Sequence, residues 1–235
     1  MPNRREIDKD GDLILHPSGT DLVDTDADAD AGVAEGEESG EDLGEKLANY
    51  EQVANDELRV SSKVLMLSSL VFKAMLGGKF KEAAELSKNT GSTDPYSIDL
   101  PDDDVEAMVI LCQILHNVYV AERPEPVVLS KLAFVTDKYE CNQALKYCAM
   151  VWIRDWLQDY DKNLPPMMDF CHLLVFSYVV DLPLEFSEVS WRLFLHHKGP
   201  ILSTSDQVKV LANHPLLRRD IIRNCIPEFP CLIQN

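Results

Sequence analysis

Residues 58–76, which read LRVSSKVLMLSSLVFKAML, decide how this sequence is interpreted. Large apolar side chains recur at spacings of three and four, which places them on one helical face. They are Val60, Val64, Leu65, Leu67, Val71, Phe72, Met75 and Leu76. Serine pairs precede two apolar runs, and serine is a favoured N-cap residue. The pattern predicts an extended entry over residues 58–60, followed by two abutting helices that serines cap.

The flanking sequence predicts further strands and helices. Residues 11–15 (GDLIL) and 97–101 (SIDLP) are expected to be strands. A short helix is expected over 81–86, and a long one over 102–119, where three aspartates favour the positive end of the helix dipole. Apolar periodicity, prolines and serines predict further helices from 126, from 142 through 156, and over 167–180, 187–198, 205–213 and 215–225.

This order of elements resembles the BTB/POZ interaction domain. The likeness is carried by "VL…S.VF..ML" within residues 58–76 and by LAFVTDKY at 132–139. The resemblance implies an α+β fold, with a small sheet flanked by a helical cluster, over residues 11–157. An all-α C-terminal extension over 158–235 would follow. Where the family usually has a tight hairpin between its first two strands, roughly forty residues intervene here.

Charge is concentrated in one segment of the chain. The net charge is −18, and residues 21–57 hold fourteen acidic residues and one lysine, which leaves −5 for the rest. Residues 20–57 are therefore expected to be a disordered acidic insertion, and residues 1–10 a flexible N-terminus. Nucleic-acid binding is not expected, because phosphate contacts need clustered basic residues. Arg218, Arg219 and Arg223 are interpreted as a solvated helix face.

The sequence also predicts where the protein works. Its longest apolar run, 173–180, is too short to cross a bilayer, and residues 1–11 lack the apolar core of a signal peptide. A soluble intracellular protein, cytoplasmic or nuclear, is expected. The cysteines, of which five fall inside helical patterns and none forms Cys-x-x-Cys, are interpreted as buried thiols in a reducing compartment.

No pattern predicts a metal, a cofactor or a catalytic site. Asp24, Asp26, Asp28, Asp30 and Glu35 have the spacing of a calcium loop, but Ala29 stands where the sharp turn needs glycine. A solvated acidic tract is favoured instead. Cys171-His172 and His196-His197 are sequence neighbours, whose side chains diverge on a helix. We therefore expect a protein that is not an enzyme and binds neither metal nor cofactor.

The resemblance implies a non-enzymatic protein–protein interaction module that self-associates, as a homodimer. Asp12 and Lys63 match positions that place opposite charges at the interface of dimeric BTB domains. An ordinary end-of-strand acid and an exposed lysine are the alternative. A dimer that exchanges N-terminal strands is not expected, because residues 1–11 are polar.

The second function that the resemblance implies is a substrate adaptor for a cullin-type ubiquitin ligase. Its partner-facing helices would lie within 105–119 and 122–138, and the residues expected to face the partner are Val105, Met108, Tyr119, Phe134 and Tyr139. Most of a further apolar set is expected in the core, while a few members could line a partner groove. That set is Phe72, Met75, Phe80, Trp152 and Trp156.

Overall fold

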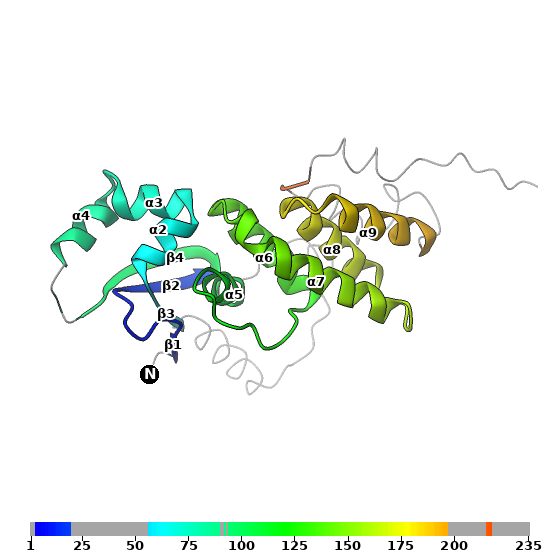
Figure 1. Ribbon diagram of the computed structural model, residues 1–235, viewed down its shortest axis with the longest axis horizontal. Helices are drawn as coiled ribbons and strands as arrows, with labels where there is room; N and C mark the ends of the chain where they lie inside the picture. The colour runs from blue at the N-terminus through cyan, green and yellow to red at the C-terminus, as the bar shows by residue number, and fades with distance from the viewer. Residues whose placement is uncertain (1–2, 20–55, 90–91, 93, 197–214, 218–235) are drawn as a thin grey trace, which may run out of the picture. The chain divides into compact units, whose positions relative to one another are not determined.

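The structure is a computed structural model that describes residues 3–19, 56–89, 92, 94–196 and 215–217 (Figure 1). It divides into two compact units, residues 1–118 and 119–235. We call them the sheet unit and the helical unit. The division falls before the domain boundary predicted at 157, and the predicted domain limits stay a prediction.

In its described residues, the sheet unit contains four strands in the order β1-β3-β2-β4. These are β1 (Asn3–Glu6), β2 (Leu13–Gly19), β3 (Asp56–Val60) and β4 (Tyr96–Asp104). β2 and β3 are antiparallel, with Leu13 opposite Val60 and Leu15 opposite Leu58. This confirms that the two predicted strands pair across the long acidic segment. β4 runs parallel to β2 on the other side.

Strand β1 corrects the expectation of a flexible N-terminus for residues 3–6. It pairs in parallel with β3, with Arg4 opposite Glu57 and Arg5 opposite Leu58. Arg4 Nε lies 2.7 Å from the Glu57 carboxylate, and Arg5 Nη2 lies 3.2 Å from that of Asp56. Charged side chains are common on edge strands, where they discourage pairing with other chains. Because β1 reads NRRE, it lacks the alternation of apolar and polar residues that would predict a strand.

Four helices complete the described part of the sheet unit. They are α2 (Ser62–Ser68), α3 (Leu70–Gly77), α4 (Lys81–Lys88) and α5 (Val105–Leu115). The two serine-capped helices are confirmed: Ser61 Oγ accepts a hydrogen bond from Val64 N at 3.4 Å, and Ser69 Oγ from Phe72 N at 3.0 Å.

Helix α5 is shorter than predicted at both ends. Residues 102–104 continue β4, and Asp104 caps the helix by accepting from Ala107 N at 2.9 Å. At the other end Asn117 has a φ of 55°, in the left-handed region that ends helices. The predicted span of 102–119 therefore takes in a strand end and a turn.

The helical unit contains α6 (Pro126–Lys138), α7 (Asn142–Tyr160), α8 (Met167–Val179) and α9 (Pro183–His196). The first three confirm predicted helices, and α9 begins four residues earlier than the predicted start at 187. The predicted helix over 205–213 lies outside the described residues, as does that over 215–225 beyond residue 217. Helix α8 packs against α6, α7 and α9 and is buried along most of its length.

Each unit has its own apolar core. Phe72 in the sheet unit and Phe176 in the helical unit are both fully buried. Among the described residues, no helix combines the length and apolar content needed to cross a bilayer.

Candidate protein-interaction surfaces

Asp12, directly before β2, is hydrogen-bonded to the first residue of α2. Its carboxylate accepts hydrogen bonds from Ser62 N at 2.8 Å and from Ser62 Oγ at 2.6 Å. Ser62 is the first residue of α2, where backbone N–H groups lack intrahelical partners and the helix dipole is positive. Asp12 therefore has a structural role within one chain, besides the interface role that the resemblance implies.

Lys63 follows Ser62 and is exposed. Asp12 and Lys63 thus lie at the same corner of the sheet unit, but no ion pair joins them within the described part of a single chain. The carboxylate of Asp12 contacts the serine instead. Whether the two charges meet between two copies stays a prediction.

A second polar contact holds the same corner from α5. Ser61 N donates to His116 Nε2 at 3.0 Å, while His116 Nδ1 lies 2.8 Å from the carbonyl oxygen of Cys112. Because Nε2 accepts, the tautomer that fits is the one with its proton on Nδ1, which donates to the Cys112 carbonyl oxygen. This contact could not be predicted from local sequence patterns, because 55 residues separate its partners.

The α2–α3 edge, defined as Lys63, Leu67, Leu70 and Lys73, is the most exposed apolar surface of these two helices. Leu67 is 80% exposed and Leu70 is 69% exposed. Lys63 lies one turn before Leu67 in α2, and Lys73 one turn after Leu70 in α3. Helical spacing placed Leu67 on one face with Leu65, whereas in the structure Leu65 is buried and Leu67 is exposed. Neighbouring exposed apolar side chains indicate an interaction surface.

The structure corrects two of the five residues expected to face a partner. Met108 and Tyr139 are 0% and 2% exposed, so both belong to the core. Helix α5 is buried along residues 107–112, whereas periodicity predicts a single buried face. Val105 and Phe134 are half-buried. Tyr119 is 83% exposed.

The further apolar set is mostly packed, as expected. Phe72 and Trp152 are buried, and Met75 and Trp156 are half-buried. The Trp156 ring lies under the Arg123 guanidinium, 3.7 Å from the ring centroid, and Trp156 Nε1 donates to the Pro124 carbonyl oxygen. Phe80 differs from the others, because it is 59% exposed.

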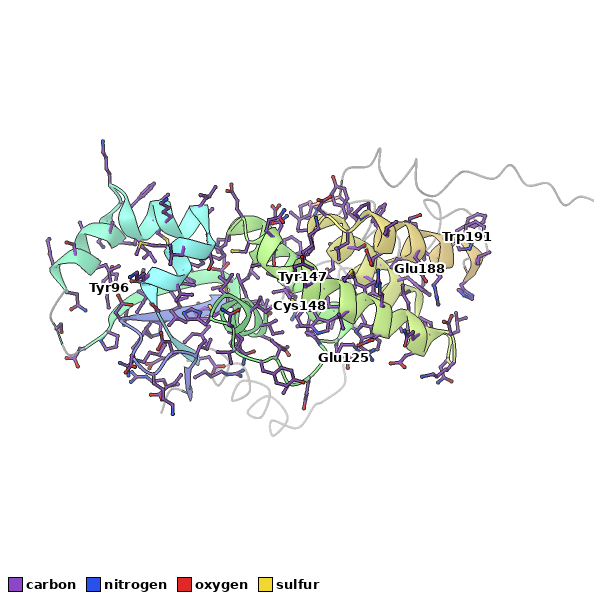
Figure 2. The ribbon with its side chains drawn as sticks, in the orientation of Figure 1. Tyr96, Glu125, Tyr147, Cys148, Glu188 and Trp191 are labelled. Atoms are coloured by element: carbon purple, nitrogen blue, oxygen red, sulfur yellow. The ribbon has the colours of Figure 1, made fainter. Side chains whose placement is uncertain are left out.

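A second exposed surface lies on helix α9 and was missed from the sequence. The α9 stripe, defined as Leu184, Glu188, Trp191 and Leu195, follows one helical face. Its three apolar members are 75%, 59% and 56% exposed in that order along the chain. Figure 2 labels Glu188 and Trp191 on this helix. The predicted helix start at 187 left Leu184 outside the helix, so the stripe could not be recognised.

The Cys171-His172 pair lacks the chemistry of an activated nucleophile. Both residues are buried in α8, and burial raises the pKa of the Cys171 thiol to about 12, with a smaller contribution from Asp169. Burial also lowers the pKa of His172, which Asp169 partly opposes. A reactive cysteine needs the opposite, a thiol pKa below its usual value.

Within the described ranges, no three His, Cys, Asp or Glu side chains are placed to hold a metal ion. The calcium-loop spacing over 24–35, His197, His214 and the three arginines between 218 and 223 lie outside those ranges. No protein-family model, no curated protein and no solved structure matches this chain.

Proposed function

We propose that this chain is a non-catalytic protein–protein interaction module that self-associates through its sheet unit. The α2–α3 edge carries this proposal, because Leu67 near the end of α2 and Leu70 at the start of α3 are 80% and 69% exposed and only two residues separate them. Covering such side chains removes apolar surface from water, which is the main favourable term in association.

Several hydrogen bonds hold the corner beside this edge in one arrangement. Asp12 and His116 both hold the start of α2, and Ser69 caps α3. A pre-organised surface loses little conformational entropy on binding. The resemblance to BTB/POZ domains supports the same proposal and adds a register. Lys63 of one copy would approach Asp12 of the other, and a buried pair of this kind disfavours wrong alignments.

Light scattering after size-exclusion chromatography tests the proposal. At tens of micromolar the full chain is expected to exceed its single-chain mass of 26.5 kDa. Leu67→Ser combined with Leu70→Ser should lower the measured mass. Leu164→Ser is the matched control, because Leu164 is 62% exposed and lies between α7 and α8. A full chain that stays monomeric, or a double variant with unchanged mass, would contradict the proposal.

A cullin-type ligase adaptor is the second candidate. Tyr119, one of the residues expected to face such a scaffold, is 83% exposed. Exposed tyrosines are frequent anchors of protein interfaces. Pull-down with a cullin N-terminal domain should succeed with the full chain and weaken with Tyr119→Ala. Absence of binding by the full chain removes this candidate. For either function, we propose that the protein acts in the cytoplasm or the nucleus.

A further inference from the structure

The α9 stripe presents three large apolar side chains on one face of a 14-residue helix. Trp191 is the central anchor, and its ring lies 5.7 Å from that of Phe194, centroid to centroid. Tryptophan contributes strongly at interfaces because it offers a large, rigid contact area. Self-association through the sheet unit, as proposed above, does not involve this surface.

The opposite side of α9 is fixed, so the stripe has a defined orientation. Val189 and Leu193 are buried. Glu185 is 4% exposed and accepts hydrogen bonds from Arg154 of α7 at 2.8 and 3.1 Å. The helix therefore cannot turn its stripe inward without breaking a buried charge contact, which is costly.

The one charge within the stripe is already paired. Glu188 accepts a hydrogen bond from Arg192 Nη2 at 3.0 Å. Arg192 also donates to the carbonyl oxygen of Leu157 at 2.9 Å and pairs with Asp161. A partner that covers the stripe would remove water from the Glu188 carboxylate. Because Arg192 already pairs with this carboxylate, the large cost of burying an unpaired charge is avoided.

The spacing of the stripe is symmetric and fits a second copy. Leu184 and Leu195 are equidistant from the midpoint between residues 189 and 190. In an antiparallel pair of α9 helices, Leu184 faces the second copy's Leu195. The same contact recurs, related by the two-fold axis, about 16 Å along the helix. Glu188 then lies level with Trp191 and next to Arg192 of the second copy, so acid meets base on both sides.

We propose that the α9 stripe is a second self-association surface, on which two copies of this chain pack antiparallel about a two-fold axis. A two-fold interface requires a surface that complements itself, and the stripe does so in both its apolar ends and its Glu188–Arg192 charges. An anionic membrane is a poorer occupant, because the stripe has no flanking lysine cluster and the chain carries a net charge of −18.

Light scattering on a chain that already carries Leu67→Ser and Leu70→Ser isolates the new surface. This variant is expected to remain dimeric, at twice 26.5 kDa, at tens of micromolar. Adding Trp191→Ser should return it to the single-chain mass, whereas adding Leu164→Ser should not. Circular dichroism verifies that the exposed substitutions preserve the helices.

The outcomes separate the two proposals. Suppose that the full chain associates but the variant with Leu67→Ser and Leu70→Ser is monomeric. This result overturns the α9 proposal and leaves the proposed function standing. A dimer that persists with Trp191→Ser also overturns it. A monomer that binds phosphatidylserine vesicles through Trp191 would assign the stripe to a membrane instead and likewise overturn it.

Photo-crosslinking tests the antiparallel arrangement directly. Benzoylphenylalanine at position 184, in a mixture of unlabelled and ¹⁵N-labelled chains, should crosslink to residues near 195 of another copy. Crosslinks near 184 of the other copy would show a parallel pair and contradict the two-fold arrangement. Crosslinks only within one chain would show that another copy does not cover the stripe.

Discussion

The two units hold their helices in place by different kinds of contact. In the sheet unit, hydrogen bonds at the helix start position α2: Ser62 donates to Asp12, and Ser61 donates to His116. In the helical unit, charged side chains join α7 to α9 and to the turn before it. The first kind depends on capping geometry and the second on charge pairing. The units should therefore respond differently to substitution.

The largest effects should come from the two cores. Phe72→Ala in the sheet unit and Phe176→Ala in the helical unit each remove a fully buried ring and should lower the free energy of unfolding by about 3–5 kcal/mol. Native-state hydrogen exchange should localise each loss to its own unit. Equal acceleration throughout both units, from either variant, would show one cooperative body instead of two.

Arg154→Ala tests the charge contact of the helical unit. It leaves the Glu185 side chain, 5% exposed, without its partner, so the free energy of unfolding should fall by about 2 kcal/mol. Lys146→Ala is the control, because its partner Asp181 is 75% exposed and the expected loss is below about 0.5 kcal/mol. Urea unfolding followed by circular dichroism compares them, and similar losses would contradict the expected role of burial.

Asp12→Ala tests the capping contact of the sheet unit. The variant loses the acceptor for both Ser62 N and Ser62 Oγ, at a cost of about 1–2 kcal/mol in unfolding free energy. Asp12→Asn keeps one acceptor oxygen and should recover part of the loss. Thermal unfolding ranks the three chains, and an alanine variant as stable as the parent would remove Asp12 as a structural contact.

The smallest effect should be a pH dependence of the helical unit. Burial holds the pKa of His172 below its usual 6.5, so the unfolded chain takes up a proton first as pH falls. The stability from keeping this ring neutral is present above about pH 6.5 and declines below it. His172→Leu should flatten the change in urea midpoint between pH 7.5 and 5.5. His16→Gln, in β2, is the control, and an unchanged slope in His172→Leu would rule out this origin.

Local signals made much of the fold predictable. Residues 58–76 carry their own caps and apolar spacing, and Pro126 stands at the first turn of α6. Strand β1 was missed because arginines and acids, not apolar alternation, accompany its pairing. The start of α5 was misplaced because aspartates suit a cap and a first helical turn equally well.

The candidate surfaces were predictable only in part. The corner with Asp12 and Lys63 was located, but Ser62 and His116 were not, since their contacts join distant segments. Leu67 was placed on one helical face with Leu65, but only Leu65 is buried, and Met108 was expected to face a partner but is buried. Spacing shows which residues share a helical face, but it does not show how many sides of that helix other elements cover.

The antiparallel pairing of β2 with β3 also has a practical consequence. Their register is set by strand pairing and by Arg59 Nε, which donates to the Gly11 carbonyl oxygen at 2.9 Å, and a tight turn takes no part in it. Closing a longer connection costs only about 0.6 kcal/mol for each doubling of its length. A reporter domain inserted between residues 19 and 56 is therefore expected to leave the pairing of β2 with β3 intact.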